Sequence, residues 1–377
     1  MTMNLLKTIT IPFILVGLIS CKPTVINDQT TNTTPPKNVI LLISDGTGLS
    51  QISSAFYFKE SVPNYTRFKN IGLIKTSSAE EDVTDSAAGA TAFACGVKTY
   101  NAAIGVDVEK KDVQNIVEIA SSKNIKTGVI ATSSITHATP ACFYAHVFMR
   151  GQEEDIASFL PKSDIDFFAG GGLNFFTKRS DEQNLLDEFK RNKFTIYTDA
   201  LADFSKIASS QKAGFLLAET KMPKMEEGRG DFLSEATELG IEFLSKDKSG
   251  FFLMSEGSQI DWGGHSNDAP YLISELIDFD NVIGKVLDFA EKDGNTLVVV
   301  TSDHETGGFT LAAKKKKKED GSEYSDYREI GPTFSTGGHS AALIPVFAYG
   351  PGAEEFVGVY ENNEIFEKIL KVTHWDK

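Results

Sequence analysis

Short apolar runs alternate with amphipathic segments along the chain from residue 38 onward. The runs are almost continuous in hydrophobic residues, which is typical of strands buried on both faces of a parallel sheet. They cover residues 39–44, 127–132, 165–169, 250–255, 296–301 and 344–349. Residues 112–122, 232–245 and 269–291 instead have apolar residues at helical spacing. The pattern predicts an α/β fold with a mainly parallel central sheet and helices on both faces, in three layers.

Polar side chains that can bind metals follow several of the predicted strands. Asp45 comes directly after the first strand, Glu256 directly after the strand 250–255, and residues 303–304 follow the strand 296–301. Residues 136–139 lie shortly after the strand 127–132. Because ligands of open α/β sheets bind beyond the carboxyl ends of the strands, we expect these side chains to meet at one edge of the sheet.

The histidines add to this pattern, since the chain has only six of them. His304 follows Asp303, His265 comes four residues after Asp261, and His339 follows two glycines. Mixed imidazole and carboxylate ligation suits Zn²⁺, and catalytic zinc keeps a position open for substrate. Two glycines between Asp261 and His265 argue against a regular helix, so we expect a loop there.

A second candidate element is the segment of residues 83–92, in which a helix is expected to start at Asp85 or Ser86. A hydroxyl at a helix N-terminus faces free backbone N–H groups and the positive end of the helix dipole, which favours a bound phosphate and a serine alkoxide. Taken alone, the same residues also fit a simple N-cap.

The charge of the chain narrows the classes of partner. With 37 Lys and Arg against 52 Asp and Glu, the formal net charge is −15, which argues against nucleic acid and anionic lipid as partners. A phosphate ester would also be repelled unless its site carried local positive charge. Residues 314–326 join a lysine run to acidic residues and are expected to form a solvated loop, or the tip of a hairpin.

The N-terminal residues resemble a processing signal. Residues 1–20 have one early cation, Lys7, and an apolar run too short to span a bilayer as a helix. Because small residues precede Cys21, we expect a signal peptide of the lipoprotein type with a lipid anchor at Cys21; a plain secretory signal is the alternative. Residues 21–37 are expected to be a flexible tether and residues 38–377 a single domain. The protein is thus expected in the periplasm or on the outer membrane.

The remaining histidines and cysteines are given no chemical role. His146 is expected to be a packed histidine in an apolar helix, and His374 to be exposed. Cys95 and Cys142 are expected to be buried free thiols, with a disulfide between them as the alternative.

Six short motifs, in this order along residues 38–350, together resemble the alkaline phosphatases of bacteria and animals. They are residues 45–48, 84–88, 138–141, 256–261, 303–308 and 338–339. The resemblance implies an enzyme that hydrolyses phosphate monoesters through a phosphoserine intermediate, at a site with two Zn²⁺ and one Mg²⁺, and releases inorganic phosphate. It also allows a homodimer. The resemblance is weakest over residues 173–230.

The resemblance also implies roles for individual residues. Ser86 matches the nucleophile and Arg150 the clamp on two phosphoryl oxygens, with Asp85 orienting Arg150. The implied metal ligands are Asp261, His265 and His339 for one zinc; Asp45, Asp303, His304 and the Ser86 oxygen for the second; and Asp45, Thr139 and Glu256 for magnesium.

Two positions beside the substrate depart from the best-known bacterial pattern. His137 stands in place of an aspartate that helps to hold magnesium, so the third site is expected to bind Mg²⁺ weakly, with Zn²⁺ or another divalent metal competing. Trp262 stands in place of a lysine that contacts phosphate through water, so product release is expected to be faster.

Two other classes of function remain as alternatives. One is a phosphodiesterase or sulfatase of the same superfamily, and the other is a non-catalytic lipoprotein that binds metal or phosphate. Ser86 together with Arg150 favours monoesters, because diesterases of this superfamily generally use threonine and lack the arginine clamp. A binding protein would need no ionisable nucleophile.

Overall fold

The computed structural model describes residues 34–376 of the chain. The predicted signal peptide and most of the predicted tether lie outside the described residues. Residues Thr34–Lys377 form one compact unit. Within residues 34–376, no helix is both long enough and apolar enough to cross a bilayer.

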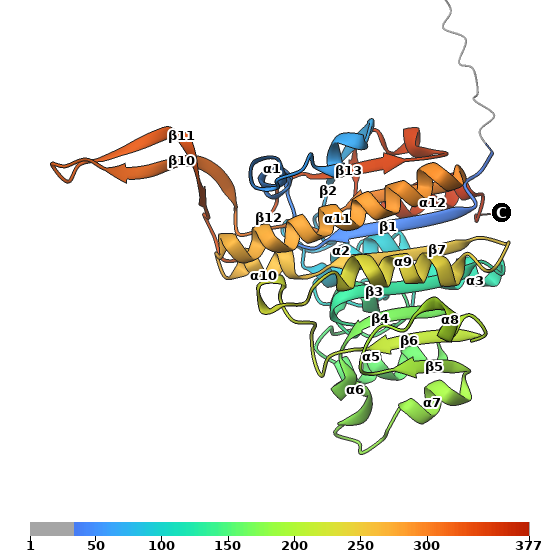
Figure 1. Cartoon of the computed structure of the whole chain (residues 1–377). Coiled ribbons are helices and arrows are strands. Elements are labelled where there is room, and N and C mark those ends of the chain that lie inside the picture. The colour runs from blue at the N-terminus through green and yellow to red at the C-terminus, as the bar shows by residue number, and fades with distance from the viewer. Residues whose placement is uncertain (1–33, 377) are drawn as a thin grey trace, which may run out of the picture. The chain divides into compact units, whose positions relative to one another are not determined.

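The core of this unit is a ten-stranded sheet in the order β14-β2-β13-β8-β1-β7-β3-β4-β6-β5 (Figure 1). Every neighbouring pair is parallel except the two pairs made by β13, which runs antiparallel to β2 and β8. The predicted mainly parallel sheet is therefore confirmed. The strands are β1 (Asn38–Ser44), β2 (Asn70–Lys75), β3 (Lys126–Ser134), β4 (Phe167–Gly171), β5 (Phe194–Tyr197), β6 (Lys212–Leu216), β7 (Phe251–Gly257), β8 (Thr296–Thr301), β13 (Ile344–Tyr349) and β14 (Gly358–Glu361).

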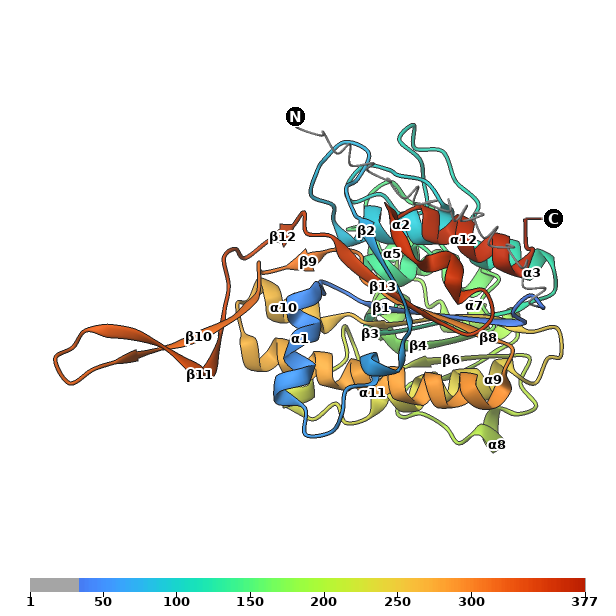
Figure 2. The same cartoon turned by 90° about the horizontal axis from the view of Figure 1, so that it is seen from above.

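Helices cover both faces of the sheet, which explains why its strands are continuously hydrophobic. Val39 and Leu41 of β1 belong to one core cluster, while Ile40 and Leu42 belong to the other. Figure 2 shows α2, α3 and α12 on one side of the sheet and α1, α9 and α11 on the other. Since successive side chains of a strand point to opposite faces, β1 needs an apolar residue at nearly every position.

The predicted helices are present with shifted ends. The helix expected over residues 112–122 begins only at Ile116, because the Asn115 side chain accepts from the N–H groups of Val117 and Glu118 and caps the first turn. The helices are α1 (Leu49–Phe58), α2 (Ser86–Cys95), α3 (Ile116–Ser122), α4 (Ala138–Ala141), α5 (Glu153–Phe159), α6 (Leu173–Thr177), α7 (Leu186–Arg191), α8 (Phe204–Ile207), α9 (Phe232–Leu244), α10 (Gln259–His265), α11 (Ala269–Asp293) and α12 (Glu364–Thr373).

A long hairpin projects from the rest of the unit (Figures 1 and 2). It consists of β10 (Thr310–Lys317) and β11 (Glu323–Thr333), so most of the lysine run lies in a strand and only residues 318–322 form the tip. The expected loop is wrong for most of the lysines, which lie in β10, but the alternative of a hairpin is confirmed. Acidic residues face the lysines across the hairpin. Lys316 pairs with Asp326 at 2.9 Å, and Lys314 pairs with Glu329 at 3.3 Å.

The register of the central strands brings their carboxyl ends to the same level. Ile43 of β1 lies opposite Glu256 of β7 on one side and opposite Thr301 of β8 on the other. The residues that follow β1 and β8 therefore emerge beside Glu256. Two short strands, β9 (Glu305–Thr306) and β12 (His339–Ser340), pair next to this edge and bring His339 to it.

Candidate active site

Asp45 follows the central strand β1 and is fully buried. The next residue, Gly46, has φ +75°, and a Cβ there would lie 2.6 Å from the Cα of Asp261. The Gly46 N–H donates to Asp303 Oδ1 at 3.3 Å. Glycine at position 46 thus allows the end of β1 to pack directly against α10.

The expected loop at residues 261–265 is in fact the helix α10. Its two glycines serve close packing: a Cβ at Gly263 would lie 2.6 Å from the Leu272 N, and one at Gly264 would lie 2.9 Å from the Thr306 O. Packing against α11 and β9 outweighs the low helix propensity of glycine. The helix also places Asp261 and His265 on one face, with Oδ2 and Nε2 3.4 Å apart.

Asp261, His265 and His339 form what we call the rim group. The Nε2 atoms of the two histidines are 3.1 Å apart, and His339 Nε2 is 3.7 Å from Asp261 Oδ1. Each Nδ1 lies 2.8 Å from a backbone carbonyl, that of Gly337 for His265 and that of Thr84 for His339. If each Nδ1 donates its proton there, both Nε2 lone pairs face Asp261, which is an arrangement suited to Zn²⁺.

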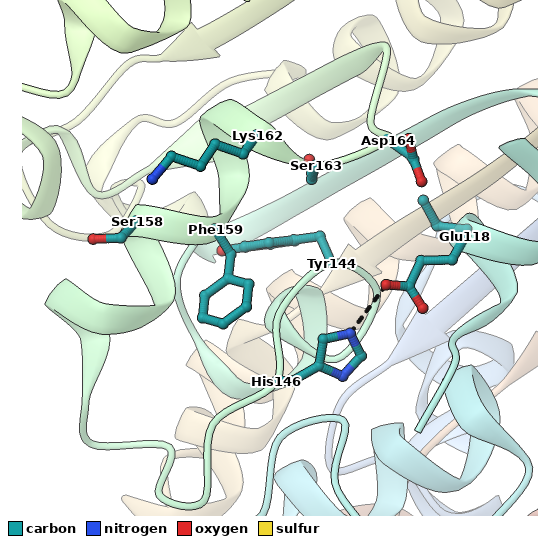
Figure 3. A pocket seen from close by; sticks show the side chains of 9 residues that line it. Glu118, Tyr144, His146, Ser158, Phe159, Lys162, Ser163 and Asp164 are labelled. Atoms are coloured by element: carbon teal, nitrogen blue, oxygen red, sulfur yellow. Dashed lines mark hydrogen bonds and ion pairs between the residues drawn. The ribbon is translucent and has the colours of Figure 1, made fainter. Parts of the chain in front are cut away.

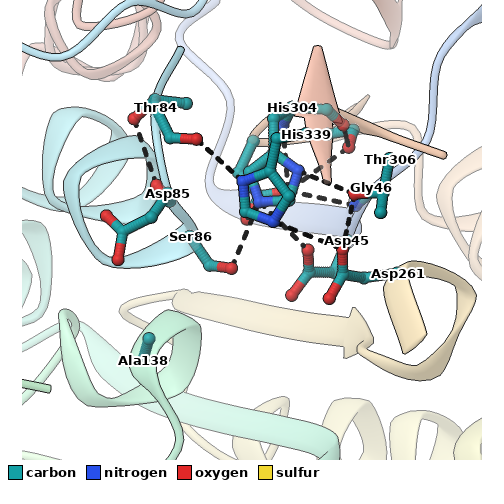
Figure 4. A network of polar contacts seen from close by, with 12 residues as sticks. Asp45, Gly46, Thr84, Asp85, Ser86, Ala138, Asp261, His304, Thr306 and His339 are labelled. Carbon is teal, nitrogen blue, oxygen red and sulfur yellow. Dashed lines mark hydrogen bonds and ion pairs between the residues drawn. The ribbon is translucent and has the colours of Figure 1, made fainter. Parts of the chain in front are cut away.

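Asp45, Asp303 and His304 form the middle group, which is fully buried. His304 Nε2 is 3.4 Å from Asp303 Oδ2 and 3.6 Å from Asp45 Oδ1. Burial lowers the pKa of His304, so the ring is neutral and can serve as a ligand. Figure 4 shows Ser86 pointing toward this histidine, with its Oγ 3.2 Å from Nε2. Asp261 lies close enough to share this group.

Asp45, Glu256 and Thr139 form the deep group. Both carboxylate oxygens of Asp45, Oε1 of Glu256 and Oγ1 of Thr139 are buried without a hydrogen-bond partner. Burial raises the pKa of Glu256 to about 8, and burial together with the charge of Asp303 raises the pKa of Asp45. Buried polar atoms are rarely left unpaired, so these oxygens fit a hard divalent cation such as Mg²⁺.

His137 joins the deep group. Its Nδ1 is buried without a partner, and the ring offers a ligand atom within 4.8 Å of ligand atoms of Asp45 and Glu256. Burial, reinforced by Arg150, lowers the pKa of His137 to about 3, so the imidazole is neutral. The sequence predicts that His137 alters the metal preference of the third site, and the structure places the ring close enough to be a ligand itself. The geometry adds a nitrogen to an otherwise oxygen-lined group, which suits a borderline metal better than Mg²⁺.

Ser86 is the first residue of α2, and the preceding Asp85 both caps this helix and binds Arg150. Asp85 Oδ1 accepts from the Ala88 N–H at 3.0 Å, while Oδ2 accepts from Arg150 Nη1 at 2.8 Å. Although burial opposes it, Arg150 lowers the pKa of Asp85, so the carboxylate stays charged. The other terminal nitrogen of Arg150 lies 3.3 Å from His137 Nε2.

Trp262 borders the deep group from α10. It is half-buried, and its ring lies edge-on to His137 with the centroids 5.7 Å apart. The structure thus brings the sequence-predicted site residues together beyond the carboxyl ends of β1, β3, β7 and β8. The start of α2, the segment between α4 and α5, α10 and β12 supply the side chains that do not follow a strand of the sheet directly.

Thr306 is a site residue that the sequence argument left without a role. Its hydroxyl donates to Asp261 Oδ1 and lies 3.2 Å from His304 Nδ1, so it touches a ligand of the rim group and one of the middle group. Its N–H donates to the Gly46 carbonyl at 3.0 Å. The only sequence signal was its place inside the motif 303–308.

The other histidines lie apart from these groups. His146 is not in a helix, contrary to expectation. Its Nδ1 lies 2.7 Å from the Gly105 carbonyl and its Nε2 3.1 Å from Glu118 Oε1 (Figure 3), so two polar contacts fix the ring where an apolar helix was expected. His374 is exposed, as expected.

The two cysteines in the described part of the chain, Cys95 and Cys142, are buried free thiols, as expected. Burial raises the pKa of the Cys142 thiol to about 12, which makes it unreactive.

Comparison with known proteins gives the following relatives. A sequence profile of the family described as alkaline phosphatase matches residues 36–319. Alkaline phosphatase 3 of Bacillus subtilis (strain 168) is 36% identical over 417 residues, covering 90% of this chain and 89% of that protein. The structure of alkaline phosphatase from the Antarctic bacterium TAB5 is 71% identical with a TM-score of 0.90, covering 92% of this chain and all of that one. A TAB5 variant with one histidine changed to aspartate, solved with Mg bound in the M3 site, is 73% identical with a TM-score of 0.91 over the same shares.

Proposed function

This chain belongs to the alkaline phosphatase family and hydrolyses phosphate monoesters, and we propose that Ser86 is the nucleophile that takes up the phosphoryl group. One observation carries the proposal. Ser86 begins α2 and its hydroxyl points at His304, beside Asp45 and Asp303, whose buried carboxylates have oxygens without a hydrogen-bond partner. A serine that only began a helix would not need buried carboxylates and a histidine beside its hydroxyl.

The enzyme binds divalent metals, and we assign them by ligand chemistry. Nitrogen and carboxylate ligands in the rim and middle groups suit two Zn²⁺ ions, while the oxygens of the deep group suit Mg²⁺, with His137 favouring a competing transition metal. Bound there, the cations supply Lewis-acid chemistry: they lower the pKa of a nearby hydroxyl or water and neutralise phosphoryl charge.

Ser86 and Arg150 carry the first half of the reaction. The Ser86 oxygen attacks phosphorus, a new P–O bond forms, and the P–O bond to the alcohol breaks on the opposite side. The serine proton leaves to solvent, and the departing alkoxide takes a proton from water. Arg150 presents its planar fork to two phosphoryl oxygens, while Asp85 fixes the guanidinium through the 2.8 Å bond.

The second half restores the enzyme. A water attacks the phosphoserine from the side that the alcohol left, the bond to Ser86 Oγ breaks, and the serine oxygen regains a proton. Inorganic phosphate is the product and should inhibit, because it makes the same contacts with Arg150. The positive end of α2 stabilises negative charge on the Ser86 oxygen in both halves.

A Ser86→Ala variant tests the proposal. It should lose nearly all activity on p-nitrophenyl phosphate, and acid quenching of the native enzyme with labelled substrate should trap label on Ser86. Ser54→Ala is a matched control, because Ser54 is also buried but bonds only the Gln51 carbonyl in α1. Substantial monoesterase activity in Ser86→Ala would contradict the covalent route, and a preference for bis-p-nitrophenyl phosphate would favour the diesterase alternative.

We also propose that the protein is exported to the periplasm or outer membrane and anchored by a lipid at Cys21. The support is the sequence of residues 1–21 alone. Labelled palmitate should be incorporated into the native chain but not into a Cys21→Ser variant.

Sedimentation of the purified protein tests whether it is a homodimer.

A further inference from the structure

An exposed lysine from another part of the chain lies at the border of the active site. Lys221 belongs to the segment between β6 and α9, and its Nζ lies 4.6 Å from the centre of the Trp262 ring. Among residues 34–376 no carboxylate pairs with Lys221. A lysine over the face of a tryptophan is attracted by the ring, so the ammonium has a preferred position although it stays in solvent.

The backbone around Lys221 is tied to the elements that build the site. The Met222 N–H donates to the Thr132 carbonyl of β3 at 3.2 Å, and the buried Gln259 of α10 donates to the Met222 carbonyl at 2.8 Å. Gly171 at the end of β4 leaves room for this segment, since a Cβ there would lie 2.9 Å from the Lys221 Cα. Lys221 is therefore held at the carboxyl edge of the sheet.

Trp262 connects this cation to the candidate catalytic residues. Its ring lies edge-on to His137, which in turn lies 3.3 Å from Arg150. The two cations differ in their partners: Arg150 is bound to Asp85, while within the described residues Lys221 contacts only the indole face. The groups around Ser86 are buried, so an ester with its phosphoryl group at Arg150 has room for its alcohol part only on the solvent side, and Lys221 is exposed on that side of Trp262.

We propose that Lys221 and Trp262 form a subsite for the leaving group that favours alcohols bearing a negative charge, such as a carboxylate or a second phosphoryl group. The inference rests on the proposed function. In a chain with a net charge of −15, one unpaired ammonium at the border offsets the repulsion of such substrates. The subsite acts on binding, because the charge on the carboxylate or second phosphoryl group of the alcohol is the same before and during the reaction.

The test compares two substrates that differ in one charge, phenyl phosphate and 4-carboxyphenyl phosphate, at a pH where the carboxylate is ionised. In the metal-loaded enzyme, Lys221→Ala should raise KM for the carboxylated ester roughly 2- to 5-fold more than for phenyl phosphate, as for one solvent-exposed ion pair. The kcat values should be unchanged. High salt should reduce the difference in the native enzyme, and Lys221→Arg should restore it.

Lys224→Ala is the matched control. Lys224 lies in the same segment and stacks on an aromatic ring in the same way, 4.0 Å from the centre of Tyr271, but not on Trp262. It should leave the ratio of the two KM values unchanged. If Lys221→Ala changes neither KM, changes both equally, or lowers kcat, the subsite is wrong. Activity on phenyl phosphate is measured in these variants and in Ser86→Ala. Loss of activity in Ser86→Ala alone supports the proposed nucleophile independently of the subsite.

Discussion

The rim group and the deep group differ in how the protein holds their ligand atoms. His265 in the rim group is 41% exposed in its side chain, and backbone carbonyls orient both imidazoles of that group. In the deep group Asp45 and Glu256 are fully buried, and three of their four oxygens have no hydrogen bond. The rim ligands are therefore positioned by the fold, while the deep ligands repel one another until a cation joins them. The metals should matter more for the stability of the deep group than for that of the rim.

The largest effect should come from Asp45→Asn. Asp45 contributes to both the middle and the deep group, so metal affinity should fall at least about 100-fold, and activity with it. Stability should change in opposite directions with and without metal. Because burial and the neighbouring carboxylates raise the pKa of Asp45, its ionised form destabilises the metal-free fold. The variant should melt a few degrees higher than the native protein in chelator, and lower with metal, by calorimetry.

Asp280→Asn is the control for these opposite changes in melting temperature. Asp280 is equally buried, but it is paired with Lys59 and accepts from the Asn64 N–H at 3.1 Å. Its loss should lower the melting temperature whether or not metal is present. If Asp45→Asn behaved in the same way, the contrast between the deep and rim groups would be wrong.

Thr306→Val tests the contact between the rim and middle groups. Because Thr306 orients Asp261 and lies beside His304, removing its hydroxyl should weaken metal binding roughly 10- to 100-fold. Metal content after dialysis measures this. Thr301→Val is the control, since the Thr301 hydroxyl lies 3.3 Å from the Pro345 carbonyl and touches none of the groups. Equal metal loss in both variants would show that packing, not ligand orientation, is responsible.

His137→Asp should change which metal the deep group prefers. An aspartate replaces a neutral nitrogen ligand by oxygen, so the affinity for Mg²⁺ should rise roughly 10-fold and activity after partial chelation should depend on added Mg²⁺. His137→Asn separates the added charge from the loss of the ring. No response to Mg²⁺ in His137→Asp would contradict the assignment.

The sequence predicts some parts of this molecule better than others. Continuous hydrophobic runs predict the strands because both faces of the sheet are covered, and strand-end residues such as Asp45 and Glu256 follow from that. The helix α10 does not follow from helix propensity, which is low for glycine, because Gly263 and Gly264 are needed for contacts with distant Leu272 and Thr306. Lys221 could not be found at all, since its place over Trp262 depends on the course of the segment between β6 and α9.

The smallest effect should come from a histidine outside the three groups. Although burial opposes it, the hydrogen bond to Glu118 raises the pKa of His146, and the same bond lowers the pKa of Glu118. The stabilisation from charged His146 is present in full below its ordinary pKa of 6.5 and is lost as the pH rises through the higher folded value. The stabilisation from Glu118 is present above its ordinary pKa of 4.5 and is lost as the pH falls through the lower folded value.

The pair should therefore contribute most between these two ordinary values, by about 1 kcal/mol once screening at the partly exposed Glu118 is allowed for. Urea unfolding of native protein and His146→Gln across this range measures it, and the difference should shrink above the folded pKa of His146. His374→Gln, at an exposed position, should show no such dependence. Neither His146 nor Glu118 belongs to a metal group, so the stability difference between native protein and His146→Gln should be the same in chelator. A difference that depended on metal would contradict the separation of this pair from the deep group.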